Sequence, residues 1–102
     1  MVLDRNKYLR VVKAYVAKTI CSIEFEIDDE ISKSMRQRIT KGNLVTLKDV
    51  DENGNPVDLY DYITANNLTA AESNYVRNCV VKDYNNAGWT CTWTDGEFKL
   101  GF

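Results

Sequence analysis

The sequence predicts an α+β fold in one small domain covering residues 1–102, and three observations support this prediction. The length suits one ordinary domain, and 44% apolar with 27% charged residues are typical of a globular chain. Helix-like and strand-like patterns follow one another in the order α-β-α-β-α-α-β-β. The last two strands are predicted to form an antiparallel hairpin, so we expect a small mixed or antiparallel sheet packed against helices.

The first segment, residues 4–19, has the periodicity of a basic amphipathic helix with Asp4 as its N-cap. At about 100° per residue its apolar side chains fall in one half of the helical wheel, whereas a strand would mix them with the cations on both faces. The cations on the outer half are Lys7, Arg10, Lys13 and Lys18. This basic face predicts contact with an acidic protein surface, with nucleic acid, anionic lipid or plain solvent as alternatives.

The next segments are a predicted strand and a predicted helix. Residues 21–27 alternate strictly between apolar and polar types, as a half-buried strand does. Glu24 and Glu26 would then share the exposed face, where they could form an acid/base pair or simply face water. A helix over residues 28–41 follows, with acids at its start, cations near its end and Gly42 as its stop.

A second strand is predicted over residues 44–50, followed by a turn at residues 51–55. Pro56 then occupies the first position of a helix that runs to about Asn66. The rival interpretation makes residues 57–63 the return strand of a hairpin.

The last helix and the hairpin have the clearest local patterns. Thr69 and Glu72 have the spacing of a capping box, which predicts a helix over residues 70–84. Asp95-Gly96 joins two alternating runs and predicts a type I′ turn. One face of this hairpin then carries four aromatic residues with Cys91 and Leu100 between them; they are Trp89, Trp93, Phe98 and Phe102. We expect this face to be either core or an interface with another protein or a second copy of the chain.

Residues 59–102 also resemble the second half of a winged-helix domain in the order of their elements alone. The helix that begins at residue 70 would then enter the major groove of DNA. Its outward residues would be Asn74, Arg77, Asn78 and Lys82. Charge opposes this alternative, because residues 49–102 carry three cations against nine acids and DNA affinity depends on phosphate neutralisation.

The segment that contains Asp49, Asp51 and Asn53 matches the first seven positions of an EF-hand calcium loop. Pro56 then breaks the pattern, and Tyr60 stands where a bidentate Glu is needed. An ordinary tight turn explains the same residues. We therefore expect no metal and no cofactor.

Composition limits the remaining function classes. The chain has no His, which removes the common catalytic base and most zinc ligand sets. Three Cys without a C-x-x-C pair predict free thiols in a reducing compartment. The charged first residues and the lack of a long apolar run lead us to expect a cytoplasmic protein with no membrane partner.

We therefore expect a non-enzymatic protein-binding module that acts as an inhibitor, adaptor or regulatory subunit, with a homodimer as an open alternative. The DNA-binding regulator is the second interpretation. The short chain, with ten Asn, six Tyr and no His, resembles in composition the small accessory proteins of bacteriophages that bind a host protein. The sequence does not identify the partner.

Overall fold

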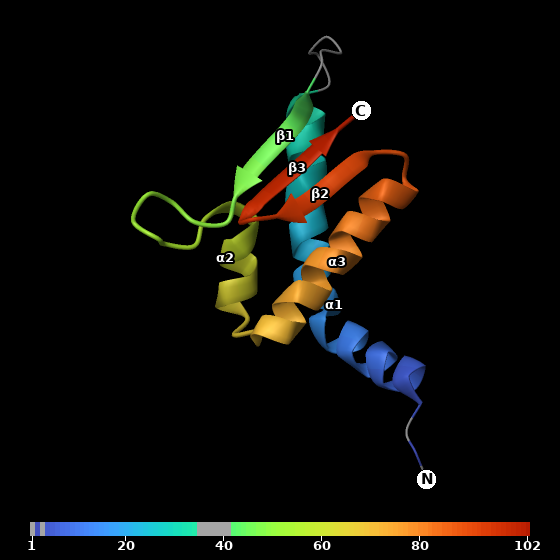
Figure 1. Ribbon diagram of the computed structural model, residues 1–102. Coiled ribbons are helices and arrows are strands. Elements are labelled where there is room, and N and C mark those ends of the chain that lie inside the picture. Colours follow the sequence, from blue (N-terminus) through green and yellow to red (C-terminus); the bar gives the residue numbers. More distant parts are fainter. Residues whose placement is uncertain (1, 3, 35–41) are drawn as a thin grey trace.

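The computed structural model describes residues 2, 4–34 and 42–102, which form an α+β fold with an antiparallel sheet. The helices are α1 (Arg5–Lys33), α2 (Asp58–Ala65) and α3 (Ala70–Asn86), and the strands are β1 (Asn43–Lys48), β2 (Thr90–Thr94) and β3 (Glu97–Gly101). The strand order is β1-β3-β2, so the last strand of the chain is the central one (Figure 1).

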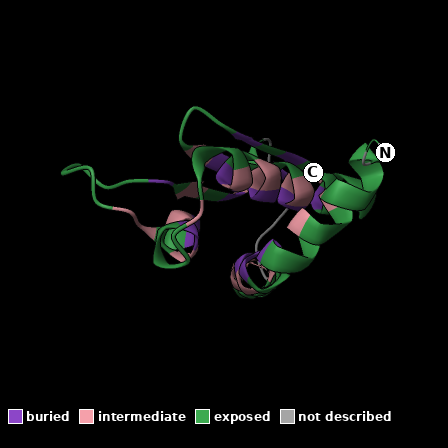
Figure 2. Cartoon of the chain, turned by 90° about the horizontal axis from the view of Figure 1, so that it is seen from below, coloured by how far each residue is buried: buried purple, intermediate pink, exposed green. Residues whose placement is uncertain are grey.

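The helices cover one face of the sheet, and the main core lies between the two layers (Figures 1 and 2). Exposed and buried residues alternate along β2, and on β3 the exposed Lys99 lies between the buried Phe98 and Leu100, as expected for a sheet with one open face. Phe98 and Leu100 on the central strand have no exposed surface. They pack with residues of all three helices, among them Ile23, Ile63 and Val80.

Residues 21–27 are helical, which shows that the predicted strand was wrong. The helix α1 runs without a break through this segment, so the predicted strand and the start of the predicted helix 28–41 belong to one helix. The observed order is therefore α-β-α-α-β-β. The end of the predicted helix, residues 35–41, lies outside the described residues.

The helical periodicity of buried residues explains this correction. The buried residues of α1 recur at intervals of three or four; they are Val16, Thr19, Ile20, Ile23 and Ile27. Cys21 and Phe25, which completed the alternating pattern, are exposed, and Phe25 keeps 72% of its surface. Ile23 and Ile27 are four residues apart and therefore fit both the helical and the strand period. Because Cys21 and Phe25 are also apolar, the seven-residue window favoured the strand.

The helix after the turn at residues 51–55 is confirmed and the rival hairpin is wrong, but the prediction that Pro56 is the first residue of this helix was also wrong. The helix α2 begins at Asp58, two residues after Pro56, because Pro56 is still paired with Val50 in an isolated β-bridge. Asp58 has a positive φ of 49°, a conformation uncommon outside glycine but tolerated by Asp.

The capping box and the hairpin are both confirmed. The Thr69 hydroxyl accepts from the Glu72 backbone N–H, and the Glu72 carboxylate accepts from the Thr69 N–H. Asp95 and Gly96 have φ values of 52° and 74°, as a type I′ turn requires. The register sets Trp93 opposite Phe98, as predicted.

Candidate protein-interaction surfaces

The first three turns of α1, residues 5–15, form a basic arm that projects from the fold. In Figure 1 this blue segment bends away from the rest of α1 and runs out on the side opposite α2. In the view from below it is almost wholly coloured as exposed (Figure 2). The four predicted cations are all exposed, as expected from the helical wheel; they are Lys7, Arg10, Lys13 and Lys18. Arg5, which was not among them, is exposed as well. No acid lies between Asp4 and Glu24.

The arm also exposes large apolar side chains, which the sequence did not lead us to expect. Tyr8 keeps 58% of its surface, and Val11 and Tyr15 each keep 68%. These residues follow an i, i+3, i+7 spacing and therefore lie along one side of the helix. Of the arm's apolar residues only Leu9 and Val12 are partly buried. The arm thus carries a stripe of apolar surface among its cations.

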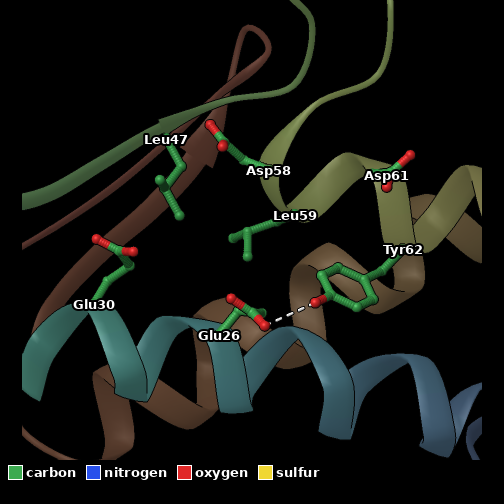
Figure 3. A pocket seen from close by; sticks show the side chains of 7 residues that line it. All are labelled: Glu26, Glu30, Leu47, Asp58, Leu59, Asp61 and Tyr62. Atoms are coloured by element: carbon green, nitrogen blue, oxygen red, sulfur yellow. Dashed lines mark hydrogen bonds between the residues drawn. The ribbon is translucent and has the colours of Figure 1, made fainter.

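A second surface is an acidic hollow between the C-terminal half of α1, the strand β1 and the helix α2 (Figure 3). It has a volume of about 180 Å³, and its lining residues are Glu26, Glu30, Leu47, Asp58, Leu59, Asp61 and Tyr62. Four of these seven are carboxylates and none is a cation. The Tyr62 hydroxyl donates to Glu26 Oε1 at 2.8 Å, and this bond raises the pKa of Tyr62.

A shallow apolar depression adjoins the acidic hollow and shares two of its residues, Glu26 and Tyr62. The rest of its lining comes from α1, namely Cys21, Ser22 and Phe25. The exposed Phe25 therefore lines a depression that shares the Glu26 carboxylate with the acidic hollow. Together, the hollow and the depression offer a negative, partly apolar surface, which suits a positively charged group on an apolar stem.

Glu24 and Glu26 do not form the predicted pair on one strand face. Residues two apart on a helix point to different sides, so Glu26 faces α2 and Glu24 faces α3. Burial and the neighbouring Asp83 carboxyl raise the pKa of Glu24 to about 7. Nearby, the Tyr84 hydroxyl donates to Asp28 Oδ1 at 2.6 Å. This carboxyl cluster joins α1 to α3.

Asp49 is engaged within the fold rather than available to a cation. It is 9% exposed, and its two oxygens accept from Trp93 Nε1 at 2.8 Å and from Arg77 Nη2 at 3.3 Å. The Arg77 guanidinium also lies over the rings of Tyr60 and Trp93, 5.2 and 5.6 Å from their centres. Arg77 was expected to point outward, but the structure places it against Asp49 and these rings.

The rest of the calcium-loop candidate is a hydrogen-bonded turn. Asp51 Oδ1 accepts from the backbone N–H groups of Asn53 and Asn55, at 2.8 and 2.9 Å. These bonds, that from Asn55 above all, lower the pKa of Asp51. Within the described residues no group of three His, Cys, Asp or Glu is placed to hold a metal ion.

The remaining sequence candidates lie on α3 and on the hairpin. Asn74, Asn78 and Lys82 are exposed along α3. The aromatic face of the hairpin is mostly core, because Trp93 is 7% exposed and Phe98 is fully buried. Trp89 is half-buried and Phe102 keeps 58% of its surface; their ring centres are 5.6 Å apart, next to the start of β2 and the end of β3.

The acidic hollow was not predicted from the sequence, although the spacing of its carboxylates is visible there. Glu26 and Glu30 are four apart, and Asp58 and Asp61 are three apart, so each pair lies on one side of its helix. The two pairs come together because α1 packs beside α2. The strand wrongly predicted for residues 21–27 gave no reason to expect this packing.

No protein-family model matches the chain, and no curated protein or solved structure is significantly similar to it. Across the part of the chain that the structure describes, no helix has the length and apolar character required to cross a membrane.

Proposed function

We propose that this chain is a small non-enzymatic protein-binding module that binds its partner through the basic arm of α1. The observation that carries the proposal is the apolar stripe of Tyr8, Val11 and Tyr15, exposed among cations on a segment that projects from the fold. An inhibitor, adaptor or regulatory subunit, such as the accessory proteins of bacteriophages, would act in this way.

The apolar stripe suits the helix-in-groove mode of recognition. In that mode an amphipathic helix anchors itself through residues at i, i+3 and i+7, which is the spacing found here. Tyr is also enriched among the residues that contribute most to binding at protein interfaces. Covering these three side chains would remove their apolar surface from water, which favours binding by about 25 cal/mol per Å² before the entropic costs.

The cations of the arm define the charge of the partner. Lys7, Arg10 and Lys13 are exposed within two turns of one another, and the described structure gives none of them an ion pair. Such a group accelerates encounter with an acidic surface and disfavours basic partners. The matching surface is therefore an acidic groove with apolar walls.

The placement of Arg77 weighs against the winged-helix alternative. A residue that reads bases must reach the groove, whereas the Arg77 guanidinium is tied to Asp49 at 3.3 Å. With Arg77 paired, Lys82 is the one other cation on α3 that could neutralise DNA phosphates. These contacts favour the protein-binding proposal.

An affinity pull-down from nuclease-treated host lysate tests the proposal. We expect the wild-type chain to retain one protein in near-equal amount, and the Tyr8→Ala/Tyr15→Ala variant to lose it. Lys82→Glu, which changes charge at an exposed position of α3 away from the arm, serves as the control and should keep the partner. Retention by the arm variant, or capture of nucleic acid alone when nuclease is omitted, would contradict the proposal.

A further inference from the structure

We propose that the basic arm of one copy binds the acidic hollow of a second copy, so that two chains form a closed two-fold dimer. This inference rests on the proposed function, because it assigns a second copy of the chain to the same arm; a protein captured by the arm in the pull-down would displace that copy. It starts from the observation that the chain itself carries the kind of surface that the arm requires.

The two surfaces have opposite charge. Residues 5–23 of α1 contain five cations and no acid, whereas residues 24–30 contain five acids and no cation. The helix α2 adds Asp58 and Asp61 to the acidic side. Lys33 is the neighbouring cation on α1, and it is already paired with Asp29 at 3.1 Å and Glu30 at 3.4 Å. The acidic surface keeps an excess of negative charge for the arm.

The two surfaces also match in apolar content. Tyr8, Val11 and Tyr15 are exposed on the arm, and Phe25 is exposed to 72% beside the hollow. The shallow depression next to Phe25 offers a place for an aromatic ring, with the half-buried Tyr62 as one wall. Pairing these groups would cover most of the large apolar side chains that α1 exposes.

The arm cannot reach the hollow of its own chain. Both belong to α1, and at about 1.5 Å per residue the 18 residues from Tyr8 to Glu26 separate them by about 27 Å along the helix. The arm also bends toward the side opposite α2, as both views of the molecule show (Figures 1 and 2). The contact must therefore form between two molecules.

A two-fold axis closes this contact. Each copy supplies one arm and one hollow. Under a two-fold rotation the arm of each copy binds the hollow of the other copy, so neither kind of surface remains open. The contact then occurs twice in each dimer. Because its charged groups lie at the surface, its dissociation constant should rise with ionic strength.

Complementary charge reversal tests the dimer. One variant makes the arm acidic (Lys7→Glu/Arg10→Glu), and the other makes the hollow basic (Glu30→Lys/Asp61→Lys). Each variant alone sets like charges against each other, so its dimer dissociation constant should rise at least about tenfold in sedimentation equilibrium at low salt. An equimolar mixture should restore the affinity, because each mutated surface then meets an opposite charge.

Two controls accompany the mixing experiment. Lys82→Glu/Lys99→Glu makes the same change of net charge as the arm variant, away from both surfaces, and should dimerise like the wild-type chain. Circular dichroism should show that each variant keeps its helix content. A wild-type chain that stays monomeric at high concentration and low salt, an unaffected dimer in either reversal variant, or no recovery in the mixture would overturn the inference.

Failure of the dimer differs from failure of the proposed function. If the wild-type chain is monomeric but the arm still captures another protein in the pull-down, the arm is a binding element for that protein and the dimer is wrong. If assemblies grow steadily with concentration instead of stopping at two chains, the contact is head-to-tail and the closed dimer is again wrong.

Discussion

The two halves of α1 use the same kinds of residue for different purposes. The half beyond Tyr15 buries Val16, Ile23 and Ile27 completely against α2, α3 and the sheet, whereas the arm contains no fully buried residue. Apolar residues recur at helical spacing in both halves. The difference shows that helical spacing marks the sides of a helix, while the packed neighbours decide whether a side is core or exposed surface. Substitutions in the second half should therefore affect folding, and those in the arm should affect binding.

The largest contrast is expected between Ile23→Ala and Tyr15→Ala. Ile23 is fully buried, so its truncation leaves a cavity and should lower the free energy of unfolding by about 3 kcal/mol. Tyr15 is 68% exposed, and its truncation should change that free energy by less than about 0.5 kcal/mol. Urea denaturation at low protein concentration measures both values without a contribution from association. Equal losses would show that the arm is part of the folded core.

Asp49→Ala should give the next largest effect. It removes the acceptor of Trp93 Nε1 and of the Arg77 guanidinium, and it leaves a partly buried charge unpaired. We expect a loss of about 2 kcal/mol in the free energy of unfolding. Asp51→Ala changes a carboxylate in an exposed turn and should cost less than half as much. A smaller effect at position 49 than at position 51 would contradict the assignment of Asp49 as a structural residue.

Removing the N-cap of α3 and removing the N-cap of α1 should have smaller effects, which differ from each other. Thr69→Ala breaks the capping box of a helix packed against the sheet and should cost about 1 kcal/mol in global stability. Asp4→Ala removes the cap that accepts from the Asn6 N–H at 2.8 Å. Because that cap begins the arm, we expect its loss to fray the first turn in hydrogen exchange and to leave the denaturation midpoint unchanged.

The smallest effect concerns pH. The pKa of Glu24 rises from an ordinary value of 4.5 to about 7 in the folded chain, so between these values the folded state holds the proton more tightly. This contribution to stability is present below about pH 4.5 and is lost as the pH rises through 7. Glu24→Gln should therefore stabilise the chain above pH 7 by roughly 0.5–1 kcal/mol, after allowance for solvent screening.

The control for this effect is Glu26→Gln. Glu26 faces α2 and accepts from the Tyr62 hydroxyl, away from Asp83. Its replacement should leave the slope of stability against pH between pH 4.5 and 7 unchanged. A steep slope that persists in Glu24→Gln would assign the titration to another carboxyl of the cluster.

The sequence predicted the parts of the fold that local chemistry determines. Asp95-Gly96 specifies its turn because both residues tolerate positive φ, and Thr69 with Glu72 specifies a helix start. Residues 21–27 were misassigned because Cys21 and Phe25 complete a strand-like alternation, whereas Ile23 and Ile27 alone fit both periods. Their helical state depends on the burial of Ile20 and Ile27 by distant segments.

The candidate sites were less predictable, because they depend on which elements lie side by side. The cations of the arm could be located from the helical wheel, but the exposure of Tyr8 and Tyr15 depends on where α1 leaves the core. Arg77 was predicted to face outward because a charged residue on a helix usually does. Its pairing with Asp49 joins residues 28 apart, beyond the range of any local pattern.

The strand order β1-β3-β2 has a consequence for how the chain folds as it is synthesised. Among the described strands β1 pairs only with β3, so the first strand has no strand neighbour there until residues 97–101 have left the ribosome. The helices form earlier from local contacts, but the apolar surface that they turn toward the sheet remains uncovered until then. A product that stops at Thr94 would keep both outer strands and lose the central one, leaving it without a sheet.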